Sequence, residues 1–97
     1  MFKIKEDKVK VIACGAGCGS GMLNNLDVDL LITGEFNHDE IMHEVHRKIT
    51  VIVTDHTNTE RGHHIQFREK FLEFLKSHSE HVDIFLSELD RDPLEPL

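Results

Sequence analysis

The amino-acid sequence predicts an α/β fold in which a mostly parallel sheet of about four strands is flanked by helices. Four short apolar runs alternate with helix-like stretches along the 97 residues. The second and third runs are almost unbroken, as expected of strands that are buried on both faces. The order β-α-β-α-β-α-β is typical of parallel strands joined by crossover helices. We therefore expect a single α/β module over residues 1–97, a size at which one core suffices.

Each expected strand is a short apolar run bounded by turn-forming or polar residues. Lys8–Gly15 is rich in β-branched residues and ends in glycines. Val28–Gly34 and Ile49–Asp55 are the two nearly continuous runs, and Val82–Leu89 is the fourth. These runs are too short for ordinary helices, which supports their assignment to a sheet.

Three helices are expected between the strands, over residues 19–26, 38–48 and 59–78. The second and third have an apolar stripe at helical spacing, which is how a helix buries one face against a sheet. The stripe of 38–48 consists of Ile41, Met42 and Val45. The stripe of 59–78 consists of Phe67, Phe71, Phe74 and Leu75. The proline-containing tail should be irregular, and Met1 to Asp7 are expected to be frayed.

Charge and cysteine content limit the functional classes. The formal net charge of −7 and the scattered basic residues argue against nucleic acid as the main ligand. Cys14 and Cys18 are too few for a disulfide framework and suit a reducing compartment. The sequence has no cationic leader with a cleavage site, and no apolar run approaches the roughly 18 residues of a membrane helix. We therefore expect a cytoplasmic protein without membrane contact.

Several polar side chains follow the expected strands at the point where each strand ends. In an open parallel sheet, ligands bind outside the carboxyl ends of the strands, and these ends share one edge. This edge is therefore the predicted functional site. The residues expected there are Cys14 with the loop GAGCGSG, Glu35 and His38, and Asp55, His56 and Glu60.

Two interpretations of His56 and Glu60 remain open from the residues alone. An imidazole and a carboxylate four residues apart at a helix start can each bind a divalent metal. Alternatively, Thr57 and Glu60 form a capping box, in which the glutamate satisfies a backbone amide at the helix start. The glycine-rich loop likewise suits either a phosphate cradle or a tight turn with Ser20 as a cap. Cys14 suits a ligand, a nucleophile or a packing residue, and the roles of both cysteines stay open.

The order of several motifs resembles one protein family. The segments VDLLITGEFNHDEI, VIVTDHTNTERG and LSELDRDPLEPL, preceded by CGAGCGSG, are similar to the C-terminal part of the Nif-three-like family and closest to its eukaryotic branch. Members of this family are often labelled GTP cyclohydrolase 1 type 2. The resemblance covers nearly the whole chain from Val9 onward, and the motifs occur in the family's order and spacing.

The resemblance implies a dinuclear site for a divalent metal (Zn, Mn or Fe) in a toroidal homo-oligomer. It assigns His56 and Glu60 as metal ligands and offers His38 as a weaker candidate, because Asp39 replaces the second histidine of a family pair. The family's other ligands lie in an N-terminal half that this sequence lacks. The sequence therefore reads as one half of such a protein, either a fragment or a short relative.

Two hypotheses of function follow. The first is a metal-dependent hydrolase or GTP cyclohydrolase, in which Glu35 or Asp55 is the candidate base and the substrate is undefined. The second is a non-catalytic module that binds protein partners or assembles an oligomer. Because two ligands cannot fix a catalytic metal, we expect the chain alone to be inactive. We also expect a homo-oligomer, since a small sheet leaves edges that need covering.

Overall fold

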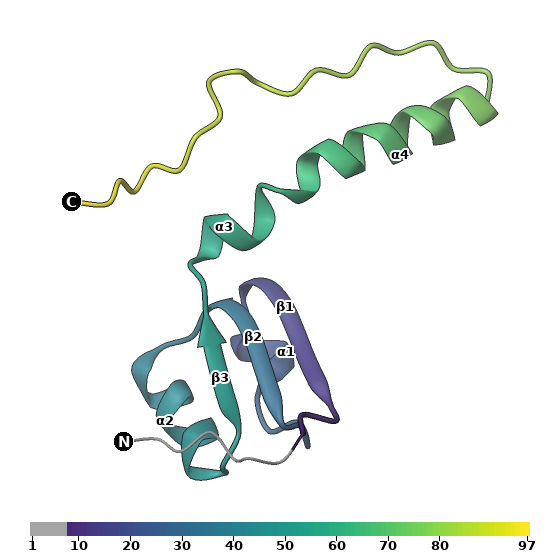
Figure 1. Ribbon diagram of the computed structural model, residues 1–97. Coiled ribbons are helices and arrows are strands. Elements are labelled where there is room, and N and C mark those ends of the chain that lie inside the picture. Colours follow the sequence, from purple (N-terminus) through teal and green to yellow (C-terminus); the bar gives the residue numbers. More distant parts are fainter. Residues whose placement is uncertain (1–7) are drawn as a thin grey trace. The chain divides into compact units, whose positions relative to one another are not determined.

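The computed structural model describes residues 8–97, and the expectation that Met1 to Asp7 are frayed lies outside them. These residues form two compact units, of which the first ends at Thr59 and the second spans Glu60–Leu97. Figure 1 shows the elements of each unit along the chain. The first unit contains strands and helices in alternation, so the predicted α/β class is confirmed.

The first unit is built on a parallel sheet with the strand order β1-β2-β3 (Figure 1). In its register, Leu31 of the central strand lies opposite Ala13 of β1 and Val51 of β3. The parallel pairing is confirmed, and the described sheet has three strands where about four were predicted. The strands are β1 (Ile12–Cys18), β2 (Leu30–Glu35) and β3 (Thr50–Val53).

Helices α1 (Ser20–Leu23) and α2 (His38–His46) pack against one face of this sheet. Leu23 of α1 and Ile41 of α2 belong to the cluster around Leu31, which is fully buried. Of the apolar stripe predicted for the second helix, Ile41 packs against this core, while Met42 and Val45 are half-buried. The buried hydrophobic residues of the cluster are Leu23, Leu31, Phe36 and Ile49.

The other face of the sheet differs from the prediction that strands two and three are buried on both sides. Ile12 of β1 and Ile52 of β3 are 56% and 43% exposed, while Leu30 and Ile32 of β2 are half-buried. Because side chains alternate along a strand, these residues point away from the face that contains Leu31. Within the first unit, β2 thus buries one face, which contains Leu31 and Thr33, whereas Val53 of β3 is exposed on that same face.

The second unit begins at Glu60 and contains helix α4 (His63–Ser77) and the segment that follows it. The helix predicted over residues 59–78 is found as α4 and, before it, the end of the short helix α3 (His56–Glu60). Figure 1 shows α4 as the longest helix of the described residues. No helix in this part of the chain is long and apolar enough to span a membrane.

The fourth predicted strand was wrong, because residues 82–89 form no strand in the structure. An apolar run becomes a strand only where a neighbouring backbone supplies hydrogen bonds. Here the carbonyl of Ile84 accepts a hydrogen bond from Arg68 Nε of α4 at 2.7 Å. A side chain of the preceding helix thus occupies a backbone group that a strand would use for pairing.

Helix α2 begins with a capping box formed by Asn37 and Glu40. The pKa of the Glu40 carboxyl is held below its usual value, chiefly because the backbone amide of Asn37 donates to it at 2.9 Å. Partial desolvation opposes this effect, and hydrogen bonds from Ser20 and Asn24 add to it. Glu40 therefore connects the start of α2 to α1.

We predict an acid-sensitive contribution of Glu40 to stability. A carboxyl whose folded pKa is lowered stabilises the fold above its unfolded pKa, and this contribution is lost as the pH falls through the folded pKa. Melting temperatures measured from pH 7 to pH 3 should fall less in Glu40→Gln than in the wild type, because glutamine has no carboxyl group to protonate. Glutamine can still serve the capping box, so the helix start is kept. Asp39→Asn is the matched control and should fall like the wild type. An equal fall in all three proteins would contradict the role of Glu40.

Candidate functional site

The carboxyl ends of β2 and β3 bring Glu35 and His56 together. Glu35 is the last residue of β2, and His56 is the first residue of α3, which follows β3. The distance between His56 Nδ1 and Glu35 Oε2 is 2.8 Å. The two side chains are 45% and 58% exposed, so the pair lies at the surface. Both residues lie at the edge where the sequence predicts them, and their hydrogen bond is an additional finding.

The local backbone explains why these two side chains meet. Gly34, directly before Glu35, is buried, and a Cβ at this position would lie 2.8 Å from the carbonyl of Gly17 and 3.0 Å from that of Asp55. Only glycine permits so close an approach of three backbone segments. Asp55, directly before His56, has a φ of 71°, which turns the chain sharply from β3 into α3.

The hydrogen bond between the two side chains determines which ring nitrogen of His56 suits a metal. An ionised carboxylate only accepts hydrogen bonds, so Glu35 accepts from Nδ1–H. Coordination by His56 would then use Nε2. Metal-binding histidines usually donate a hydrogen bond from their other ring N–H to a carboxylate or carbonyl, which fixes the orientation of the ring. Because both side chains are partly exposed, the pair contributes little to stability.

The structure does not bring all of the predicted site residues together. Glu60 is the last residue of α3, Asp55 precedes the helix, and His38 is the exposed first residue of α2. Across residues 8–97, no group of three or more His, Cys, Asp or Glu side chains is arranged to hold a metal ion. The metal assignments of His56, Glu60 and His38 therefore stay predictions.

The alternative capping box at the start of α3 differs from the observed helix. Thr57 lies within α3 as its second residue, and its hydroxyl makes no hydrogen bond among the described residues. The hydroxyl that acts here belongs to Thr59, which accepts from Gly17 N at 2.8 Å and donates to the carbonyl of His56 at 2.7 Å. Thr59 is not among the residues predicted from the sequence for this site. Its position directly before Glu60 in NTERG was the available signal.

The glycine-rich loop is largely part of β1 and its turn into α1. Gly19 rather than Ser20 is the N-cap of α1, and it has no side chain to make a capping hydrogen bond. The hydroxyl of Ser20 instead donates to Glu40 Oε2 at 2.9 Å and lies 3.1 Å from Cys18 Sγ. Cys14 and Cys18 are both free and exposed, so Cys14 is not a buried packing residue.

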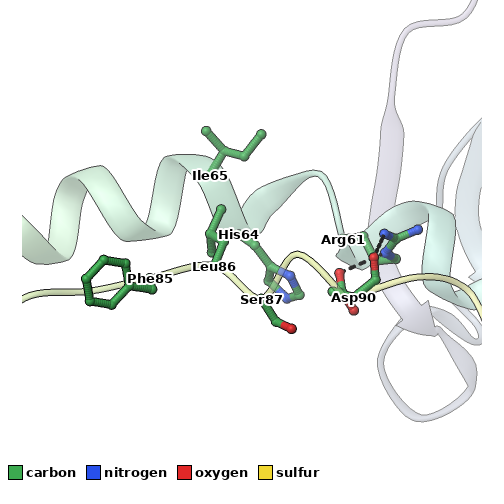
Figure 2. A pocket seen from close by; sticks show the side chains of 7 residues that line it. All are labelled: Arg61, His64, Ile65, Phe85, Leu86, Ser87 and Asp90. Carbon is green, nitrogen blue, oxygen red and sulfur yellow. Dashed lines mark hydrogen bonds and ion pairs between the residues drawn. The ribbon is translucent and has the colours of Figure 1, made fainter.

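In the second unit, the residues of two motifs from the sequence analysis lie against each other. Arg61 of NTERG donates from Nε to Asp90 Oδ2 at 3.0 Å and from Nη2 to the Asp90 carbonyl at 2.8 Å. The pair lines a pocket of about 420 Å³ that has apolar and polar walls. Figure 2 shows the pair at one end of the lining side chains. The lining residues are Arg61, His64, Ile65, Phe85, Leu86, Ser87 and Asp90.

Comparison with known proteins identifies the family. The family model Duf34/NIF3 (NGG1p interacting factor 3) matches residues 1–93. Over 93 residues the chain is 43% identical to NIF3-like protein 1 of Bos taurus, covering 95% of this chain and 24% of that protein. Over 89 residues it is 40% identical to NGG1-interacting factor 3 of Saccharomyces cerevisiae, covering 90% and 29%.

The human NIF3-like protein 1 is also 43% identical, over 91 residues that cover 93% of this chain and 23% of that protein. The chain thus spans about a quarter of the length of the curated relatives it matches. No solved structure matches it. The family match covers the glycine-rich loop, the segment with Glu35 and His56, and most of the tail motif. This chain therefore belongs to the Duf34/NIF3 family.

Proposed function

We propose that this chain supplies part of a divalent-metal site, with His56 as its first ligand. The observation that supports this proposal is the hydrogen bond from His56 Nδ1 to Glu35, at the sheet edge where ligands bind in open parallel sheets. A carboxylate on one ring nitrogen holds the other in a fixed direction and makes it a better ligand. A histidine with such a partner is suited to coordination.

Glu60 is the second proposed ligand, four residues after His56 in α3. Imidazole and carboxylate donors suit Zn, Mn and Fe, which are the metals we propose. Two donors are fewer than the three protein ligands of a catalytic zinc site. Since the chain spans about a quarter of its curated relatives, we propose that the remaining ligands of a dinuclear site belong to the rest of a longer protein or to another subunit.

The proposed activity of the complete protein is metal-dependent hydrolysis, or ring opening of the GTP cyclohydrolase type. A bound divalent ion would lower the pKa of water and so supply a nucleophile. The hydrogen bond of Glu35 to His56 favours an orienting role for Glu35 over that of a base. Asp55 then remains the candidate base. For this chain alone, we expect no turnover with any added metal.

A second candidate function is assembly of an oligomer, and the exposed apolar surface favours it. In the first unit, Ile12 and Ile52 are exposed on the sheet, and in the second unit Phe67 and Phe74 are each 55% exposed. Large apolar side chains that are exposed to solvent favour association with another protein surface. We propose a homo-oligomer, and sedimentation at micromolar concentration is the test. A monomer at all concentrations would contradict it.

We predict that the chain binds Zn²⁺ or Mn²⁺ weakly and through His56. In calorimetric titrations, the binding heat of the wild type should vanish in His56→Ala. Glu35→Gln should weaken binding roughly tenfold or more, which is the usual effect of losing the partner of a metal-binding histidine. His81→Ala, an exposed histidine of the second unit, is the control and should titrate like the wild type. Equal heats in His56→Ala and the wild type would show that His56 is no ligand.

A further inference from the structure

We infer that Thr59 is a positioning residue for His56. Its hydroxyl joins the turn of α3 that contains His56 to strand β1, through one hydrogen bond accepted and one donated. The inference extends the proposed metal function, because it explains how a short surface helix keeps its histidine in place. The orientation of His56 set by Thr59 does not depend on any metal.

Strand β1 contains a bulge next to β2. The register of β1 with β2 pairs Gly15 with Thr33 and then Cys18 with Glu35. Ala16 and Gly17 therefore stand opposite one residue of β2. In a bulge of this kind one residue is left without its ladder partner. Gly17 has a φ of 66°, which glycine adopts readily.

The amide of Gly17 in this bulge is directed at Thr59. Gly17 is buried, and its N–H donates to Thr59 Oγ1 at 2.8 Å. A buried amide without a partner costs free energy, so this hydrogen bond is strongly favoured. The Thr59 hydroxyl then donates its own hydrogen to the carbonyl of His56 at 2.7 Å. The bulge and His56 are thus connected through a single oxygen atom.

Helix α3 is attached to the sheet through its side chains. Side chains of α3 contact two strands of the first unit: His56 Nδ1 lies 2.8 Å from Glu35 Oε2 of β2, and Thr59 Oγ1 accepts from Gly17 N of β1. Gly34 lies directly against Thr59, since a Cβ at Gly34 would be 2.6 Å from Thr59 Oγ1. Without the Thr59 hydroxyl, α3 loses its hydrogen bond to β1, and the exposed contact between His56 and Glu35 is weak by itself. The imidazole should then lose its fixed orientation on Glu35.

The experiment compares Thr59→Val, which keeps the shape but removes the hydroxyl, with Thr59→Ser, which keeps the hydroxyl. Thr57→Val is the matched control, because Thr57 lies in the same helix and its hydroxyl makes no hydrogen bond among the described residues. The first readout is the tautomer of neutral His56, measured from the ¹⁵N shifts of its ring. We expect the Nδ1–H form to dominate in the wild type, Thr59→Ser and Thr57→Val, and to lose its dominance in Thr59→Val. An unchanged tautomer in Thr59→Val would overturn the inference.

The second readout is the affinity for Zn²⁺ in calorimetric titrations. We expect at least tenfold weaker binding in Thr59→Val and a change of less than about threefold in Thr59→Ser and Thr57→Val. If the wild type binds no Zn²⁺, the proposed metal function fails while the tautomer readout still tests Thr59. If all variants bind Zn²⁺ equally, the positioning role fails while the metal function stands.

A third readout needs no variant and applies even if Thr59→Val does not fold. In the wild type, the amide hydrogen of Gly17 should exchange with solvent much more slowly than that of a neighbouring exposed residue such as Ala16. Slow exchange supports the hydrogen bond to Thr59. Exchange of Gly17 at the rate of an unprotected amide would overturn the inference.

Discussion

Gly34→Ala should destabilise the first unit by about 3 kcal/mol, near the upper end of the cost of overpacking. The new Cβ would lie 2.6 Å from Thr59 Oγ1, 2.8 Å from the Gly17 carbonyl and 3.0 Å from the Asp55 carbonyl. Two of these three atoms belong to backbone, which cannot rotate away as a side chain does. The β1 bulge or the turn before α3 would have to move. Urea unfolding followed by circular dichroism measures the change.

Gly21→Ala is the matched control for this prediction. Gly21 lies in α1 of the same unit, and a Cβ there would have no heavy atom within 4 Å. Alanine is a better helix former than glycine, so stability should stay unchanged or rise. Equal stabilities of Gly34→Ala and Gly21→Ala would mean that the close approach at Gly34 does not exist in solution. A destabilised Gly34→Ala should also lose Zn²⁺ binding, because the same backbone segments support Glu35 and His56.

The placement of the candidate site followed from chain order alone. Strands that are joined by helices run parallel, and their carboxyl ends share an edge, so residues that follow two strands are expected near each other. This reasoning placed Glu35 and His56 at one edge, and the structure brings them within 2.8 Å. It did not predict that Glu35 would be bonded to His56 instead of standing apart as a base. That distinction depends on side-chain direction, which periodicity does not specify.

Other features could not be predicted because they depend on contacts between segments that are distant in sequence. The run of residues 82–89 has the composition of a strand, but its pairing depends on a neighbouring backbone that composition cannot reveal. The bulge at Gly17 depends on how β1 aligns with β2. The role of Thr59 depends in turn on that bulge. In each case the local sequence permits the structure, and a second segment determines it.

Glu44 is another residue that the sequence did not single out, and it is fully buried in the first unit. Its carboxylate accepts from Arg47 Nη1 at 2.6 Å and from the backbone amide of Asn25 at 3.0 Å. Arg47 also donates to the carbonyl of Leu26 at 3.0 Å. A buried carboxylate is tolerated only with such partners, since its desolvation is costly. The i,i+3 spacing of Glu44 and Arg47 on one helix was the signal available in the sequence.

Arg47→Met should therefore destabilise the first unit by about 3 kcal/mol, because it leaves the charge of Glu44 buried with one backbone donor. Methionine keeps the apolar stem of the side chain, so the loss reports the charge and not the packing. Glu44→Gln removes that charge and retains an oxygen for the Asn25 amide, so it should cost less. The decisive protein is the double variant, which should be more stable than Arg47→Met alone in urea unfolding. If Glu44→Gln instead lowers the stability of Arg47→Met further, the loss of stability in Arg47→Met does not come from an unpaired carboxylate. The lost hydrogen bond from Arg47 to the Leu26 carbonyl then explains it.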